Sequence, residues 1–143
     1  MENKAFIRER LIKGLMEVGE KRIVGGVLIK CLKTNNVFLL YRNDKVPVWA
    51  LVSGGIDEGE TALAGLKREI HEELFIDPNE IEFKYIGVEH IPAKNIDFHY
   101  FEGFTNSQFK PILDHENLSF GWFPKDKLPS PLYKGLAEKI IKI

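Results

Sequence analysis

The chain has only one cysteine, Cys31, among its 143 residues. A single cysteine cannot form a bridge within the chain, so the sequence predicts no disulfide framework. Cys31 follows the apolar run Val27-Leu28-Ile29, which favours a buried core position over a reactive thiol. Such sparing use of cysteine is typical of a reducing compartment, and we expect a cytoplasmic protein.

Long apolar runs are also absent. No stretch approaches the roughly 20 residues that a helix needs to cross a bilayer. At the N-terminus, the charged residues Glu2, Arg8, Glu9 and Arg10 interrupt any apolar segment of the kind that a signal peptide requires. The sequence therefore predicts neither a membrane span nor a secretory leader.

An excess of one charge sign is missing as well. The chain carries 20 basic and 21 acidic residues, for a net charge of -1. Proteins held to nucleic acid by bulk charge are strongly basic, so we expect no bulk nucleic-acid binding, although a local phosphate site remains possible. The content of 44% hydrophobic and 29% charged residues is typical of a globular protein. We expect one domain over residues 1–143.

Apolar periodicity predicts a mixed α/β layering. Strands are expected at 22–32, 37–42, 48–52, 82–91, 97–105 and 119–123, and helices at 4–18, at 60–74 and from about 131. A turn is predicted at Thr34–Asn36, and Ser53-Gly54-Gly55 is expected to break the third strand. The segment 4–18 would either cover the core or pair with a second copy in a homodimer, and the sequence leaves both open.

The helix predicted at 60–74 carries two different faces. One is an apolar stripe of Leu63, Leu66, Ile70 and Leu74 at spacings of three and four. The other gathers three carboxylates, Glu69, Glu72 and Glu73, at positions i, i+3 and i+4.

Like charges at these spacings destabilise a helix by a few tenths of a kcal/mol per pair. A divalent cation among the three carboxylates would relieve that repulsion, and carboxylate oxygens suit Mg²⁺ or Mn²⁺. Zinc is disfavoured, because no cysteines or paired histidines accompany the glutamates. The alternative, a solvated acidic face without a ligand, stays open for these three residues taken alone.

The flanking residues point to a metal site. Gly54 is followed after five residues by Glu60 and after seven more by the block from Arg68 to Ile76. This spacing resembles the Nudix box of the MutT-like Nudix hydrolases, and eight of its nine specified positions match. Phe75 stands where the family has glycine, which would perturb the helix end. Upstream, Val52 and Ser53 replace the family's proline and first glycine.

The resemblance implies a Nudix-type α/β/α sandwich with a mixed sheet and a magnesium-dependent hydrolase. Glu69, Glu72 and Glu73 would hold Mg²⁺, with the Gly54 carbonyl as a further ligand and Mn²⁺ as a possible substitute. Arg68 would pair with Glu60 to position the carboxylates. The general base would be Glu69, our first candidate, or Glu116 on the acidic stretch Asp114–Asn117.

The resemblance also frames the substrate: a nucleoside diphosphate linked to another group. Arg42 would contact a phosphate and Trp49 would stack on a base, although a surface arginine and a core tryptophan are alternatives. Pro92 resembles a downstream proline of family members acting on ADP-ribose, which favours ADP-ribose or a nucleotide sugar. Nucleoside triphosphates and dinucleoside polyphosphates remain alternatives. The low net charge disfavours RNA-end processing. A non-catalytic nucleotide sensor on the same fold is the alternative from another class.

Overall fold

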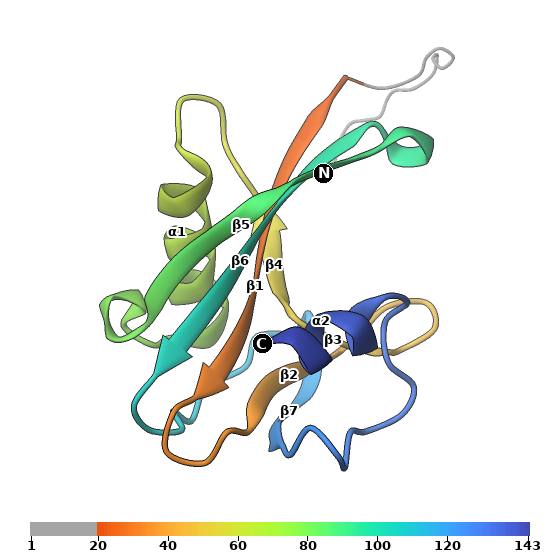
Figure 1. Cartoon of the computed structure of the whole chain (residues 1–143). Helices are drawn as coiled ribbons and strands as arrows, with labels where there is room; N and C mark the ends of the chain where they lie inside the picture. The colour runs from red at the N-terminus through yellow and green to blue at the C-terminus, as the bar shows by residue number, and fades with distance from the viewer. Residues whose placement is uncertain (1–19) are drawn as a thin grey trace.

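The computed structural model describes residues 20–143 (Figure 1). The helix predicted over residues 4–18 lies outside this range. Cys31, predicted to be buried, is fully inaccessible to solvent. Asn35 in the predicted turn at 34–36 takes a left-handed conformation with φ 63°. No helix in residues 20–143 is long and apolar enough to cross a bilayer.

One mixed sheet forms the centre of the described chain. Its strands are β1 (Arg22–Cys31), β2 (Val37–Arg42), β3 (Trp49–Ala50), β4 (Val52–Gly55), β5 (Glu82–Ile91), β6 (Ile96–Thr105) and β7 (Asn117–Phe123). Their main order is β3-β2-β1-β6-β5, with β4 paired to β1 and β7 paired to β2. Strands β1 and β6 run parallel, whereas the other pairs are antiparallel. The predicted mixed α/β class is confirmed.

The two α-helices, α1 (Ala62–Leu74) and α2 (Leu136–Lys142), cover different faces of the sheet (Figure 1). Leu66, Ile70 and Leu74 of α1 are fully buried in a cluster with Val27 and Phe38 of the sheet. A second cluster joins α2 to the opposite face. It contains Leu28, Leu39, Tyr100, Leu136 and Ile140. The sheet is therefore the middle layer between two helices.

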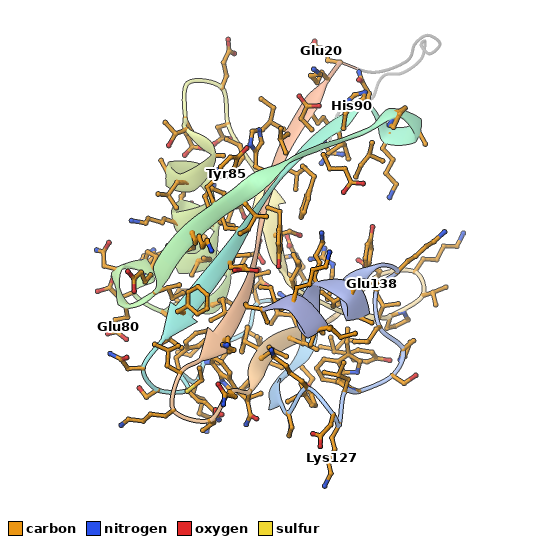
Figure 2. All side chains as sticks on the ribbon, viewed as in Figure 1. Glu20, Glu80, Tyr85, His90, Lys127 and Glu138 are labelled. Atoms are coloured by element: carbon orange, nitrogen blue, oxygen red, sulfur yellow. The ribbon has the colours of Figure 1, made fainter. Side chains whose placement is uncertain are left out.

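Figure 2 shows β5 and β6 as a long hairpin that carries Tyr85 and His90, with Glu138 of α2 on another side of the molecule. Two short 3₁₀ helices flank β5, η1 (Pro78–Glu80) before it and η2 (Pro92–Lys94) at the hairpin tip. Strand β5 forms the edge of the sheet beyond β6.

Three predicted boundaries were wrong. Ser53, Gly54 and Gly55 do not break a strand but form β4, because they pair with Gly26, Gly25 and Val24 of β1. Tertiary pairing thus overrides the local preference of glycine for turns. The interruption falls at Leu51 instead, between β3 and β4.

Both helices also begin later than predicted. Helix α1 starts at Ala62, because the hydroxyl of Thr61 accepts a hydrogen bond from Ala64 N (3.1 Å) and caps the helix. Helix α2 starts at Leu136 and not near Pro131, because residues 131–133 bond to β3: Trp49 N donates to Pro131 O (2.8 Å) and Tyr133 N to Trp49 O (2.8 Å).

Candidate active site

Gly54 and Glu69 hold β4 and α1 in close contact. A Cβ atom on Gly54 would lie 2.5 Å from Glu69 Cγ and 2.8 Å from Glu69 Oε1. Any side chain at position 54 would therefore displace the Glu69 carboxylate. The glycine places backbone atoms of β4 beside that carboxylate, an arrangement in which a carbonyl and a carboxylate could share a ligand.

Arg68 is the hub of an ion-pair network along α1. Its Nε donates to Glu60 Oε2 (2.8 Å) and its Nη2 donates to Glu60 Oε1 (3.0 Å). Its Nη1 donates to Glu69 Oε2 (3.1 Å) and to Glu72 Oε1 (3.2 Å). The pair with Glu60, eight residues away, forms because Glu60 lies in the turn before α1. The Arg68 guanidinium beside it holds the pKa of Glu60 at about 2, so this carboxylate is ionised at neutral pH.

Two further residues that contact Arg68 or Glu60 were not predicted from the sequence. Asp57 Oδ2 lies 3.4 Å from Arg68 Nη2 and adds a further carboxylate to the network. Gly65 is needed because a Cβ at that position would lie 2.8 Å from Glu60 Oε1. Neither has a distinctive signal in the sequence, because both roles depend on how the loop before α1 folds back.

Glu73 is a buried acid without enough partners. It is 7% exposed, and its Oε1 has no hydrogen-bond partner within residues 20–143. Desolvation by burial raises the pKa of Glu73 to about 9, assisted by a hydrogen bond with Glu69 and by the charges of Glu69, Glu116 and Asp114. An unpartnered oxygen in a crowd of carboxylates is the environment that a cation would stabilise.

The acidic loop Asp114–Asn117 lies close enough to Glu73 for its charges to act there. Asp114 Oδ1 accepts a hydrogen bond from Glu116 N (3.0 Å), which turns the chain into β7. Glu116 was a predicted site residue. Asp114 was not predicted as a site residue, although a second acidic residue two positions before Glu116 is a sequence signal that could have identified it. His115 is exposed.

In residues 20–143, no group of three or more acidic, histidine or cysteine side chains converges on one point as a metal site. The reason is visible in the contacts: Arg68 Nη1 holds one oxygen each of Glu69 and Glu72. The residue types nevertheless fit a hard divalent cation, because they offer carboxylate oxygens and one of these is orphaned.

Within residues 20–143, the predicted substrate-contacting residues Arg42 and Trp49 pair with other partners and not with these carboxylates. Arg42 Nε pairs with Asp44 Oδ2 at 3.2 Å. Trp49 packs between Tyr41 (ring centroids 4.9 Å apart) and Phe123 (5.1 Å), against the core cluster under α2. Pro92 is exposed in η2, at the tip of the β5–β6 hairpin and on the opposite side of the view from α1 (Figure 1).

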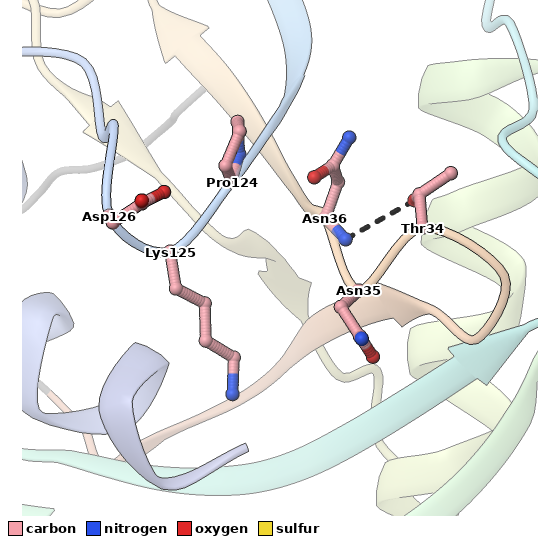
Figure 3. Close-up of a pocket in the computed structure, with 6 residues that line it drawn as sticks. All are labelled: Thr34, Asn35, Asn36, Pro124, Lys125 and Asp126. Atoms are coloured by element: carbon pink, nitrogen blue, oxygen red, sulfur yellow. Dashed lines mark hydrogen bonds between the residues drawn. The ribbon is translucent and has the colours of Figure 1, made fainter.

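A pocket of about 470 Å³ lies elsewhere, between the β1–β2 turn and the loop after β7. Its lining residues are Thr34, Asn35, Asn36, Pro124, Lys125 and Asp126 (Figure 3). Asn36 N donates to Thr34 Oγ1 (3.2 Å) at its edge. None of the predicted site residues lines this pocket.

Comparison with known proteins places these features in a family. The model of the NUDIX domain matches residues 11–142. RNA pyrophosphohydrolase from Helicobacter pylori (strain G27) is 37% identical over 89 residues, which are 59% of this chain and 56% of that protein. The chain thus matches little more than half the length of this relative. Dihydroneopterin triphosphate diphosphatase from Escherichia coli (strain K12) is 41% identical over 51 residues, 36% of this chain and 34% of that protein.

A solved structure extends the likeness to the whole fold. The NUDIX hydrolase from Nitrosomonas europaea superposes with a TM-score of 0.71 at 18% sequence identity, covering 88% of this chain and 70% of that one. At this identity the superposition shows a shared fold. The family match, in contrast, covers the box from Gly54 to Ile76 together with the strands on both sides of it.

Proposed function

The chain belongs to the NUDIX family, and from this membership and its acidic site we propose that it is a divalent-metal-dependent hydrolase of phosphoanhydride bonds. The substrate would be a nucleoside diphosphate linked to a further group. The observation that carries the proposal is Glu73, a buried carboxylate with an orphaned oxygen beside Glu69.

We assign Glu69, Glu72, Glu73 and the Gly54 carbonyl to the binding of Mg²⁺, with Mn²⁺ as a substitute. When bound, the cation would neutralise diphosphate charge and lower the pKa of a water molecule. Arg68 and Glu60 act as positioning residues, because their paired contacts fix where the helix carboxylates stand. Arg68 also supplies a positive countercharge beside the carboxylates of Glu69 and Glu72.

The contacts favour Glu116 over Glu69 as the general base. The Glu69 carboxylate already makes three contacts. It accepts a hydrogen bond from Arg68 Nη1, it is hydrogen-bonded to Glu73, and it lies against Gly54. A carboxylate with these contacts is better placed to bind a metal ion than to accept a proton. The Glu116 side chain is exposed and makes no hydrogen bond or ion pair within residues 20–143, so it is available to accept a proton from water.

We propose the substrate only as a broad class of nucleotide. The names of the two sequence relatives refer to pyrophosphate or triphosphate groups. The preference for ADP-ribose or a nucleotide sugar depended on Pro92, which the fold puts at a hairpin tip. We therefore propose a small nucleotide carrying a diphosphate or longer phosphate chain, acted on in the cytoplasm.

A panel assay tests this proposal. The purified chain is incubated with ADP-ribose, a nucleotide sugar, a nucleoside triphosphate, a dinucleoside polyphosphate and 5′-triphosphorylated RNA, with Mg²⁺ or Mn²⁺. We expect at least one to be hydrolysed with metal, none with excess chelator, and recovery when Mg²⁺ is restored. Hydrolysis that persists in chelator would contradict the metal role. Tight binding of a nucleotide without any hydrolysis would instead favour a nucleotide sensor.

A further inference from the structure

Strand β2 ends beside the acidic loop, and the pairing there is irregular. Tyr41 of β2 is paired with Ser119 of β7, but the next residue, Arg42, is paired with Asn117. One step along β2 thus corresponds to two steps along β7, which is a β-bulge with Leu118 as the extra residue. Bulges re-aim the chain, and this one sits directly after the acidic loop.

Asn43 is the residue that follows the bulge on the β2 side. Its backbone N–H donates to Glu116 O (2.9 Å), and its side-chain Nδ2 donates to His115 O (3.2 Å). A single residue therefore holds two successive carbonyls, one on each side of the Glu116 Cα.

The loop has internal bonds but needs an outside anchor. Asp114 Oδ1 accepts from Glu116 N (3.0 Å), and Asp114 O accepts from Asn117 N (3.4 Å). These bonds fix the shape of the turn without fixing where it stands relative to α1. Ile112 N, which donates to Leu74 O (3.0 Å), ties the entry of the loop to α1, and Asn43 ties its exit to the sheet.

We infer that Asn43 is a positioning residue for catalysis, because its side chain holds the acidic loop so that the Glu116 carboxylate faces the α1 carboxylates. The inference rests on the proposed role of Glu116. Asn43 is exposed and reaches the site only through the loop, so the chemistry does not use its amide directly. Loss of the Nδ2 bond would leave the backbone bond in place and loosen the loop on one side.

Replacing Asn43 with alanine tests directly, in the protein without substrate, whether the Asn43 side chain holds the acidic loop. A hydrogen bond of this kind contributes about 1 kcal/mol, so its loss should raise amide hydrogen exchange in residues 114–117 by about fivefold. The matched control is Asn36→Ala, which also removes a hydrogen bond from a side-chain amide to another loop, here from Asn36 Nδ2 to Gln108 Oε1 (3.0 Å). The control should leave exchange in the acidic loop unchanged. Equal exchange in Asn43→Ala and the unmodified protein would overturn the inference.

The second measurement is turnover, with the compound of the panel assay that is hydrolysed fastest as the substrate. A shift of the base by a fraction of an ångström should lower kcat roughly tenfold in Asn43→Ala, with KM changed less than about threefold. In a Glu116→Gln background, Asn43→Ala should lower kcat no further. Equal proportional losses in both backgrounds would show that Asn43 does not act through Glu116. An unchanged kcat in Glu116→Gln alone would instead refute the proposed base, a result that the exchange experiment does not depend on.

Discussion

Replacing Glu73 with glutamine tests the electrostatic basis of the site. The carboxyl is 7% exposed, one of its oxygens has no partner in the described part of the chain, and its pKa is raised from 4.5 to about 9. Glutamine keeps the size and shape of this side chain but cannot ionise. The variant should therefore lose the pH dependence that Glu73 confers on stability.

The sign follows from the direction of the pKa change. Because the folded chain holds this proton more tightly than the unfolded chain, the contribution to stability is complete below the unfolded pKa of 4.5. It falls as pH rises towards about 9, by at most about 1.4 kcal/mol per pH unit. Between pH 5 and pH 7 the loss is thus up to about 3 kcal/mol, a large part of the 5–15 kcal/mol typical of a folded domain.

Urea unfolding in chelator at pH 5, 6, 7 and 8 measures this effect. The free energy of unfolding of the unmodified chain should fall with pH relative to that of Glu73→Gln. Adding Mg²⁺ at pH 8 should stabilise the unmodified chain more than the variant, because a cation favours the ionised carboxyl. A difference between the two proteins that is constant from pH 5 to pH 8 would refute the assignment of Glu73 as a buried acid.

Three other experiments, with four substitutions, test the two ends of α1 and the ion pair between Arg68 and Glu60. Phe75→Gly should raise the free energy of unfolding by about 0.5–1 kcal/mol, because Phe75 is strained at φ 56° and 61% exposed; a loss of stability in thermal unfolding would contradict this. Thr61→Ala should lower it by about 1 kcal/mol through loss of the cap on Ala64, and no change would argue against the cap. Arg68→Ala and Glu60→Ala should each reduce kcat, and the double variant should lose less than the product of the two losses; independent effects would show that the pair does not work as a unit.

The sequence predicted the strands well where side-chain pattern decides the structure. Strands β2 and β5 match their expected bounds, because runs of branched and aromatic residues fit a half-buried sheet. Local pattern failed at Ser53–Gly55, where pairing with β1 makes a strand out of turn-forming residues. It failed again after Pro131, where backbone bonds to Trp49 delay α2.

The candidate site was predictable only in its helical part. Glu69, Glu72 and Glu73 share a helix face by spacing alone, and Arg68 reaches Glu60 as expected. Spacing could not tell that Glu73 would be buried while Glu72 stays exposed, because burial depends on what packs over the helix. The contacts of Asn43 depend on a bulge between distant strands, which no local pattern encodes.

The most direct test of the central claim is the turnover of Glu72→Gln. Glu72 is exposed and, among residues 20–143, hydrogen-bonded only to Arg68, so the substitution should leave the fold intact. The matched control is Glu80→Gln on η1, which removes an exposed carboxylate outside the proposed site. With saturating Mg²⁺ and the best substrate of the panel, we expect kcat to fall roughly 10²-fold or more in Glu72→Gln and to stay unchanged in Glu80→Gln. Near-normal turnover of Glu72→Gln would contradict a metal site on α1.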